Sequence, residues 1–323
     1  MAYTYFRWRT KKVSSYEERD AVLVYFAPST LLGLVVFFLL TVALGFSMMY
    51  WGIEPQSLIE EFRLSGSSLL TLGFATSDSW LMLALEFAEA TIGLVLIAVI
   101  IAYLPTIYGA FSRREVTVAM LEVRAGAPPA AWELLARYHR SRGLDALSEV
   151  WVEWERWFSE LEETHTSLAA LVFFRSPKSG RSWITAAGVI LDAAALVDST
   201  LDIPQDVRTR LCMRAGFVAL RHICDFFRIA YNADPQPTDP ISITREDFLT
   251  AYEDMASRGI PLKPDREQAW RDYAGWRVNY DVAVLTLSSL TMAPYAPWIS
   301  DRSLPGGQSR VRGIFHASPD KQM

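Results

Sequence analysis

His222 and Asp225 are the side chains whose spacing comes nearest to a catalytic motif. They lie three residues apart in a segment expected to be helical, so both face the same side. Such a pair could hold the metal of a phosphohydrolase, but two residues one helical turn apart more often form a solvated face. The sequence has no Gly-Lys-Ser phosphate loop and no Cys-x-x-Cys pair, and its histidines are scattered: His139, His165, His222 and His316. It therefore predicts no enzyme, no bound metal and no other cofactor.

Two glutamates stand out because they interrupt an otherwise apolar run. Glu86 and Glu89 are three residues apart and share one face of a predicted helix. An ionised side chain at the centre of a membrane costs about 3 kcal/mol on insertion scales, so it usually faces protein or water. One interpretation is that one of them pairs with Arg63 and supports a functional loop. The alternative is that both contact solvent at the membrane interface.

Two long apolar segments must position these residues. No charge occurs between Asp20 and Glu54, and residues 26–50 are long enough to span a bilayer as a first transmembrane helix. A signal peptide would have a shorter apolar core that begins nearer the N-terminus. A second apolar run, residues 80–112, predicts a second transmembrane helix. Residues 26–112 would thus form a membrane domain.

Basic residues flank the two predicted spans on one side. They follow the positive-inside rule, which places both termini in the cytoplasm of a multi-pass protein of the plasma membrane. Residues 1–25 would then be a cytoplasmic segment, and residues 51–79 would lie outside. The basic residues are Arg7, Arg9, Lys11, Lys12 and Arg19 before the first span, and Arg113, Arg114 and Arg124 after the second.

The segment between the spans is too apolar for a solvated loop and too short for another transmembrane hairpin. A helix over about residues 56–67, followed by a stretch of small residues, fits a re-entrant loop. Irregular backbone is tolerated at membrane depth only where it is buried in protein or lines an aqueous path. A pore is the usual reason for such a segment, and a tightly folded extracellular hairpin is the alternative.

The order of these segments resembles the two-transmembrane, pore-loop potassium-channel family over roughly residues 25–112. That family has the filter pattern Thr-Val-Gly-Tyr-Gly-Asp, and residues 71–76 read Thr-Leu-Gly-Phe-Ala-Thr. The threonine and the first glycine match, and the changes at the valine and the tyrosine are conservative. The second glycine and the aspartate are replaced. Thr71, Leu72, Gly73, Phe74 and Ala75 are the predicted filter residues.

The resemblance implies a homotetramer, because four loops must turn their carbonyl groups toward one axis to replace the hydration shell of an ion. Gly73 can adopt a left-handed conformation freely, whereas Ala75 would lose about 1–2 kcal/mol in that conformation. We therefore expect an altered outermost ion site and a permeant monovalent cation, K⁺ or Na⁺. Gly93 and Pro105 are the predicted gating hinge of the second span. The expected partners are other copies of the chain and membrane lipids.

Residues 113–323 alternate amphipathic segments with short polar breaks and predict a helical cytoplasmic domain. Residues 182–197 are short for a span and contain Asp192, so they predict a buried helix in which Asp192 pairs with Arg175 or Arg181. Residues 282–300 are also uncharged, and their two prolines favour a core or membrane-surface segment over a third span. Thr244 and Asp247 resemble a helix cap.

The overall composition limits the remaining function classes. A net charge of −5 gives no basic field for nucleic acid, so nucleic acid is not an expected partner. Cys212 and Cys224, the only cysteines, are expected to be reduced core residues. The sequence thus predicts an all-α membrane protein with a cation channel as its function. The alternative is a membrane-anchored interaction or signalling protein whose two helices only tether the helical domain.

Overall fold

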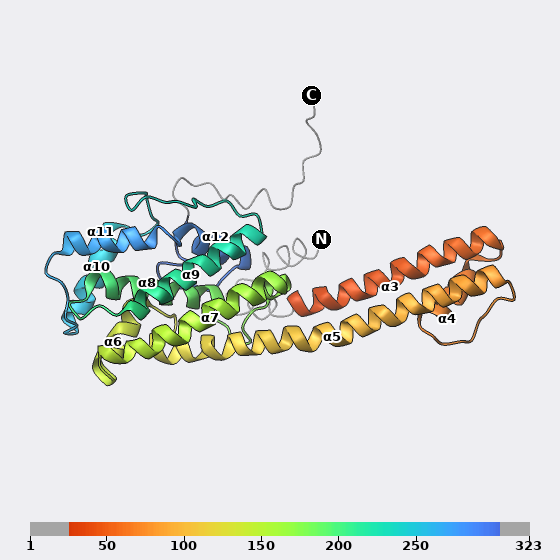
Figure 1. Cartoon of the computed structure of the whole chain (residues 1–323), viewed down its shortest axis with the longest axis horizontal. Coiled ribbons are helices and arrows are strands. Elements are labelled where there is room, and N and C mark those ends of the chain that lie inside the picture. The colour runs from red at the N-terminus through yellow and green to blue at the C-terminus, as the bar shows by residue number, and fades with distance from the viewer. Residues whose placement is uncertain (1–25, 304–323) are drawn as a thin grey trace, which may run out of the picture. The chain divides into compact units, whose positions relative to one another are not determined.

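The first apolar stretch forms α3 (Phe26–Ile53), and the second forms most of α5 (Trp80–Ala125). Between them lies the shorter helix α4 (Leu58–Leu69), which packs on α3. These helices belong to a computed structural model that describes residues 26–303 (Figure 1). Apart from one isolated bridge between Leu201 and Leu262, the regular structure of residues 26–303 is helical. The predicted all-α class is therefore confirmed.

The described chain divides into two units, residues 26–110 and residues 111–303. Helix α5 contributes to both, because its last part begins at Phe111 and belongs to the second unit. Its 46 residues correspond to a length of about 69 Å, well over the roughly 30 Å of a hydrocarbon core. The sequence predicted that this helix spans residues 80–112. In the structure it continues for another thirteen residues and ends at Ala125.

Among residues 26–303, three helices are long and apolar enough to cross a membrane: α3, α5 and α8 (Trp183–Thr200). They differ in their surroundings. Only 11% of the most apolar window of α3, and 11% of that of α5, is buried by the rest of the chain, against 94% for α8. An apolar helix surface that its own chain leaves uncovered must be covered by lipid or by another protein. The long apolar helices α3 and α5 thus indicate a membrane-embedded protein.

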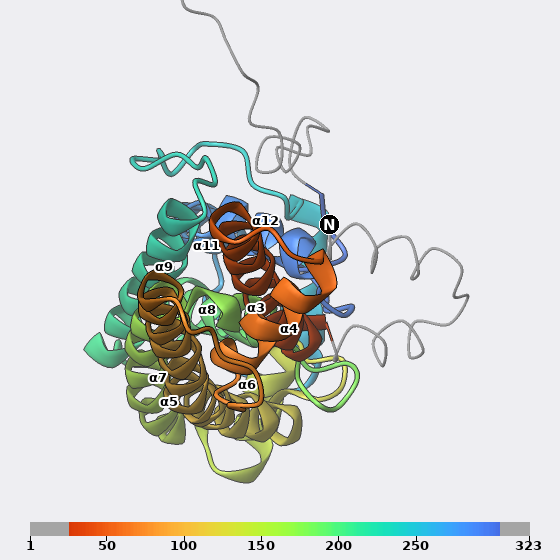
Figure 2. The same cartoon turned by 90° about the vertical axis from the view of Figure 1, so that its right-hand side faces the viewer.

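The second unit is a bundle of helices around α8. Helix α8 contacts α6, α7, α9, α11 and α12, and it lies among them in the view of Figure 2. Nearly all of its side chains are buried, which confirms the prediction of a buried helix over residues 182–197. The other elements are α6 (Ala131–Ser141), η1 (Leu144–Ala146), α7 (Leu147–Ser167), η2 (Ala169–Phe173), α9 (Val207–Phe226), α10 (Arg245–Ser257), α11 (Arg266–Arg277) and α12 (Asp281–Thr291).

Local sequence signals explain several helix ends. Helix α10 begins with a capping box in which the Thr244 and Asp247 side chains each accept a backbone N–H from the other residue, as predicted. Helix α12 has only 11 residues and ends at Thr291; the next residue, Met292, adopts a left-handed conformation. Most of its side chains are buried, so residues 282–300 include a core helix of the second unit.

Asp192 does not pair with either arginine that the sequence suggested. Its carboxylate accepts hydrogen bonds from Arg277 Nη1 at 2.6 and 2.7 Å and from the Tyr280 hydroxyl at 2.9 Å. Arg175 instead donates to the carbonyl groups of Thr291 and Met292, and Arg181 pairs with Glu122. The prediction was wrong because Arg277 is 85 residues away in the sequence and only the packing of α11 on α8 brings it to Asp192.

Several predictions concern residues outside the described range. These are the N-terminal segment 1–25 with Arg7, Arg9, Lys11, Lys12 and Arg19, and His316 near the C-terminus. Both cysteines lie within the described residues, on α9. Cys212 and Cys224 are free and buried, as expected.

Candidate functional site

Helix α4 begins and ends with well-defined local contacts. The Ser57 side chain caps its N-terminus by accepting a hydrogen bond from the Ile59 N–H, and two glutamates occupy the first turn, where the helix dipole favours negative charge. The helix starts two residues after the predicted start of the helix over 56–67. One face of α4 is buried in the first unit, including Leu64, Ser65 and Ser68.

The loop that follows α4 is fixed to the end of that helix by hydrogen bonds. The Leu72 N–H donates to the Ser67 carbonyl at 2.8 Å, and the Thr71 N–H donates to the Ser68 carbonyl at 3.0 Å. The Ser67 hydroxyl accepts from the Ala75 N–H and donates to the Ala75 carbonyl, both at 3.0 Å. Residues 71–75 thus form a compact loop that closes on Ser67.

Two residues of this loop adopt a left-handed backbone conformation. Gly73 has a φ of +71°, as the sequence predicted, and Thr71 has a φ of +54°. The φ of Ala75 is not positive, so the cost that the resemblance implied at Ala75 does not arise in this structure. The cost of a left-handed conformation falls on Thr71 instead. Thr71 is β-branched, and this conformation costs it about 1–2 kcal/mol.

Two apolar side chains of the loop are exposed. Leu72 is 61% exposed and Phe74 is 58% exposed, whereas Ala75 packs against a small apolar cluster of Tyr50, Leu64 and Met82. Apolar side chains with this exposure need a cover that residues 26–303 do not provide. The loop is therefore anchored on one side and uncovered on the other.

Glu86 and Glu89 are buried, but neither pairs with Arg63. Glu86 accepts a hydrogen bond from the Ser77 N–H at 2.9 Å and so holds the far end of the loop. Glu89 is fully buried and accepts hydrogen bonds from the Tyr50 hydroxyl at 2.8 Å and from the Ser65 hydroxyl.

Arg63 is exposed and pairs with Glu60 on its own helix, at 2.9 Å. The predicted pairing of Arg63 with a glutamate of the second span is wrong, because Arg63 lies on the exposed face of α4 and Ser65 on the buried one. The other interpretation, glutamates that contact solvent, is also wrong for Glu89. Neutral hydroxyl groups satisfy its carboxylate, and they join α3, α4 and α5.

Gly93 and Pro105 have different surroundings in α5. A Cβ at Gly93 would lie 2.0 Å from the Leu69 carbonyl oxygen, so Gly93 permits a close approach of the end of α4. Pro105 is exposed and lies inside α5, which continues on both sides of it. Whether these residues bend during gating stays a prediction.

Arg114 fixes the part of α5 that belongs to the second unit. It is buried, and its guanidinium donates to the carbonyl groups of Leu171 and Phe174 at 2.9 and 2.6 Å. A further donated hydrogen bond, 3.1 Å long, reaches His165 Nε2. Because arginine can only donate, this ring nitrogen must be the unprotonated one, and Nδ1–H donates to the Leu161 carbonyl.

The histidines and carboxylates do not assemble into a catalytic or metal site. His222 pairs with Glu162 at 2.6 Å, while Asp225 accepts a hydrogen bond from Tyr231, so the two residues of the suggested motif have different partners. Within residues 26–303 no three His, Cys, Asp or Glu side chains are grouped to hold a metal ion.

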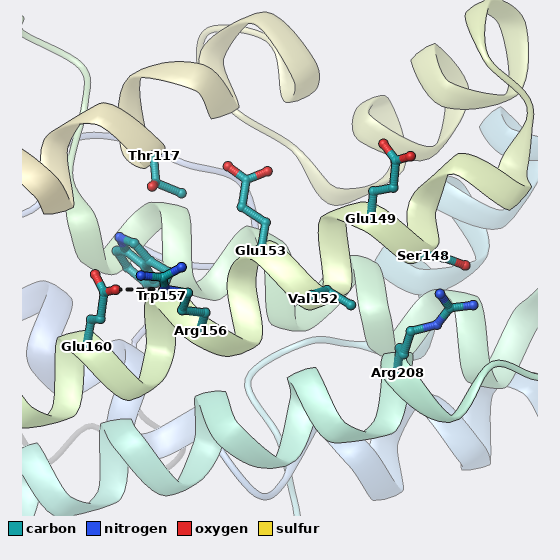
Figure 3. A pocket seen from close by; sticks show the side chains of 9 residues that line it. All are labelled: Thr117, Ser148, Glu149, Val152, Glu153, Arg156, Trp157, Glu160 and Arg208. Atoms are coloured by element: carbon teal, nitrogen blue, oxygen red, sulfur yellow. Dashed lines mark hydrogen bonds and ion pairs between the residues drawn. The ribbon is translucent and has the colours of Figure 1, made fainter.

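A cavity of about 550 Å³ in the second unit is an open groove along α7 (Figure 3). Its charged groups pair mainly with each other or with neighbours, as Arg156 does with Glu160 and Glu153 with Arg124. They do not converge on one point, so the groove has no evident reactive centre. The lining residues are Thr117, Ser148, Glu149, Val152, Glu153, Arg156, Trp157, Glu160 and Arg208.

Sequence reasoning identified the loop and both glutamates but missed Tyr50, Ser65 and Ser67, which hold them. The only available signal was the presence of hydroxyl-bearing residues on the apolar face of the helix over 56–67. Comparison of the chain with protein-family models, with curated proteins and with solved structures found no match. The geometry described above is therefore the basis for a functional assignment.

Proposed function

We propose that the protein is a homotetrameric cation channel of the cell membrane. In this proposal α3 and α5 span the bilayer, α4 and the loop after it re-enter it, and the loops of four subunits line the ion path. Both termini lie in the cytoplasm, and the second unit is a cytoplasmic domain that assembles or regulates the channel. The permeant ion is a monovalent cation, K⁺ or Na⁺.

The observation that carries the proposal is the way the loop is anchored. Ser67 closes the loop through Ala75, and Glu86 holds its end through the Ser77 N–H. With these contacts made, Leu72 and Phe74 are still exposed. They belong to the segment that connects the two long apolar helices along the chain. A protein that used its two helices only as a tether would need neither a structured loop nor a buried glutamate behind it. An oligomer in which the loops meet would cover these side chains.

The chemistry of the loop supports conduction of a weakly hydrated cation. Successive backbone carbonyl groups and the Thr71 hydroxyl are neutral oxygen ligands of the kind that replace the water around a potassium ion. The left-handed residues Thr71 and Gly73 alter the direction of successive carbonyl groups along the loop. Because Ala75 and Thr76 replace a glycine and an aspartate of the family pattern, we expect lower selectivity for potassium.

Ion flux tests this function directly. Purified full-length protein in liposomes should carry a K⁺ or Na⁺ current, and Gly73→Asp should abolish it by placing a carboxylate in the ion path. Gly143→Asp is the matched control, because Gly143 also has a positive φ and open space around it but lies in the second unit. The mass of the detergent-solubilised oligomer should correspond to four chains.

A monomeric or dimeric mass would contradict a filter made of four loops. Equal flux from the wild type and the Gly73→Asp variant would exclude this loop as the ion path. Absence of flux under all ionic conditions would favour the membrane-anchored interaction or signalling protein instead.

A further inference from the structure

The segment before α8 places three basic residues and three serines close to the start of a long buried helix. Residues 175–182 read Arg-Ser-Pro-Lys-Ser-Gly-Arg-Ser, and Gly180 turns the chain with a φ of +83°. Ser182 is the N-cap residue of α8, but its side chain makes no capping hydrogen bond. The 18-residue helix thus begins without the usual side-chain cap.

The residues of the first turn of α8 are buried, and the Ser182 side chain does not cap their N–H groups. Trp183, Ile184 and Thr185 are at most 2% exposed, and the helix itself offers no acceptor to the N–H groups of its first turn. The N-terminus of a helix also carries a partial positive charge. Such an end attracts an anion, and a buried one has an unmet demand for hydrogen-bond acceptors.

A second and independent observation comes from Ser176. Its side chain is 1% exposed, and its hydroxyl has no hydrogen-bond partner among the residues that the structure describes. Ser176 lines a small cavity of about 10 Å³ together with Arg181, Ser182 and Trp183 at the start of α8. A cavity of that size holds a single oxygen atom. Buried hydroxyl groups are normally satisfied, so the Ser176 hydroxyl is available to donate a hydrogen bond to an oxygen atom in this cavity.

A second cavity, of about 110 Å³, shares two lining residues, Arg181 and Ser182, with the first. Lys178, Ser179, Arg181 and Ser182 line it, and Glu122 of α5 faces them. The Glu122 carboxylate receives hydrogen bonds from Lys178 Nζ and from Arg181 Nε, both at 2.6 Å. A negatively charged group therefore already sits beside both cations, supplied by the chain itself.

We propose that this N-terminus of α8, with Ser176, Lys178, Arg181 and Ser182, binds a phosphate group. The guanidinium and the ammonium neutralise its charge, the helix N–H groups donate to its oxygens, and the Ser176 hydroxyl donates to the oxygen that enters the smaller cavity. Glu122 is the internal competitor, and phosphate replaces it as the partner of Lys178 and Arg181.

The site gives the second unit a ligand class that the channel proposal leaves open. Glu122 belongs to α5, so exchange of Glu122 for phosphate changes how α5 is tied to α8 within the second unit. This regulatory role depends on the proposed channel function, but phosphate binding itself does not. Binding can be measured without any ion flux, so the two proposals fail separately.

Binding of inorganic phosphate to the full-length protein in detergent, measured by calorimetry, is the first test. Arg181→Met should weaken binding by roughly tenfold or more, because it removes a charged hydrogen-bond donor. Ser176→Ala should weaken it less, and Glu122→Gln should strengthen it by removing the competitor. Arg266→Met and Ser257→Ala are the controls, since both residues are exposed and lie on other helices of the same unit.

The source of the phosphate group is decided by a second set of titrations. Glycerol phosphate represents a soluble phosphate ester, and short-chain phosphatidic acid carries the same group on a lipid, with short-chain phosphatidylcholine as the control. Binding of the soluble ester assigns the site to a free metabolite, and binding of phosphatidic acid alone assigns it to a lipid headgroup. Both results support the proposal if Arg181→Met reduces binding.

Three results would overturn the proposal. One is the absence of binding by inorganic phosphate, by the ester and by the lipid. Another is binding that Arg181→Met and Ser176→Ala leave unchanged. The third is weaker binding by Glu122→Gln, because that would make the carboxylate a support of the site rather than its competitor. Circular dichroism and a monodisperse elution profile establish that each variant is folded.

Discussion

Gly93 of α5 lies directly against the carbonyl group of Leu69 at the end of α4, so that a Cβ at Gly93 would be only 2.0 Å from the carbonyl oxygen. The end of α4 precedes the loop of residues 71–75, and its position therefore sets the position of the loop. Glycine is required at position 93 because the backbones of α4 and α5 approach each other closely there. This requirement does not depend on the proposed role of Gly93 as a gating hinge.

Replacing Gly93 by alanine should destabilise the first unit, because α4 must move to make room for the methyl group. We expect a loss of about 1–3 kcal/mol, the usual cost of overpacking. Gly45→Ala is the control, since a Cβ at Gly45 meets nothing within 4 Å. The measurement is the midpoint of thermal aggregation in detergent, and equal midpoints for the two variants would contradict the close approach.

Tyr50→Phe should weaken the same unit by removing a hydrogen bond to Glu89. The carboxylate stays buried with one oxygen unsatisfied, which costs about 1–3 kcal/mol. Tyr103→Phe, on the exposed part of α5, serves as the control. The thermal midpoint of the Tyr50→Phe variant should fall below that of the control. A midpoint equal to that of the wild type would show that the hydrogen bond from Tyr50 to Glu89 does not stabilise the unit.

Arg277→Met should prevent stable folding of the second unit. Arg277 is fully buried and donates to Asp192, to Asp281 and to the Trp298 carbonyl. Removing one member of a buried ion pair leaves the other charge uncompensated and costs about 3–5 kcal/mol.

Arg266, on the same helix as Arg277, forms an exposed pair with Glu253 of α10, and Arg266→Met should cost less than about 1 kcal/mol. The yield of monodisperse protein and the urea midpoint compare the two variants. If both variants unfold at the same urea concentration, the buried network does not stabilise the unit.

Acid should destabilise the second unit through His165. Burial, and then the positive charge of Arg114, hold the pKa of His165 well below its ordinary value of 6.5. Below pH 6.5 the unfolded chain therefore binds a proton that the folded chain does not. The stability from this source is complete above that pH and falls by about 1.4 kcal/mol per pH unit as the pH drops toward the folded pKa.

His165→Gln should flatten this pH dependence, because glutamine can still accept the hydrogen bond from Arg114 but does not titrate. Urea unfolding followed by tryptophan fluorescence between pH 5 and pH 7 gives both slopes. Parallel slopes for the two proteins would show that another group is responsible for the loss.

The sequence predicted the two long apolar helices well because their signal is local. Residues 26–50 and 80–112 are long and uncharged apart from two glutamates, and the structure forms α3 and α5 over them. The capping box at Thr244 was predictable for the same reason, since both partners lie within four residues. The end of α5 was not predicted, because the residues after 112 are charged and amphipathic. Val118, Leu121 and Ala125 of this part are buried in the core of the second unit.

The partners of the buried charges were beyond the reach of sequence reasoning. Asp192 was expected to pair with an arginine nearby in the sequence, and Glu86 or Glu89 with Arg63. In the structure Asp192 pairs with Arg277, and Glu89 accepts hydrogen bonds from Tyr50 and Ser65. A charged residue can be recognised as needing a partner from its apolar neighbours, but the choice among partners depends on which helices meet.

The amino-acid sequence by itself determined that this is an all-α protein with two long apolar helices and a helical C-terminal part, because hydrophobicity and helical periodicity are properties of neighbouring residues. Only the tertiary structure decided that Asp192 pairs with Arg277, that the loop closes on Ser67, and that an unsatisfied Ser176 lies at the start of α8. These features depend on how the helices pack. A hydrogen bond forms only where donor and acceptor meet at a suitable distance and angle, and that is set by the three-dimensional arrangement of the chain.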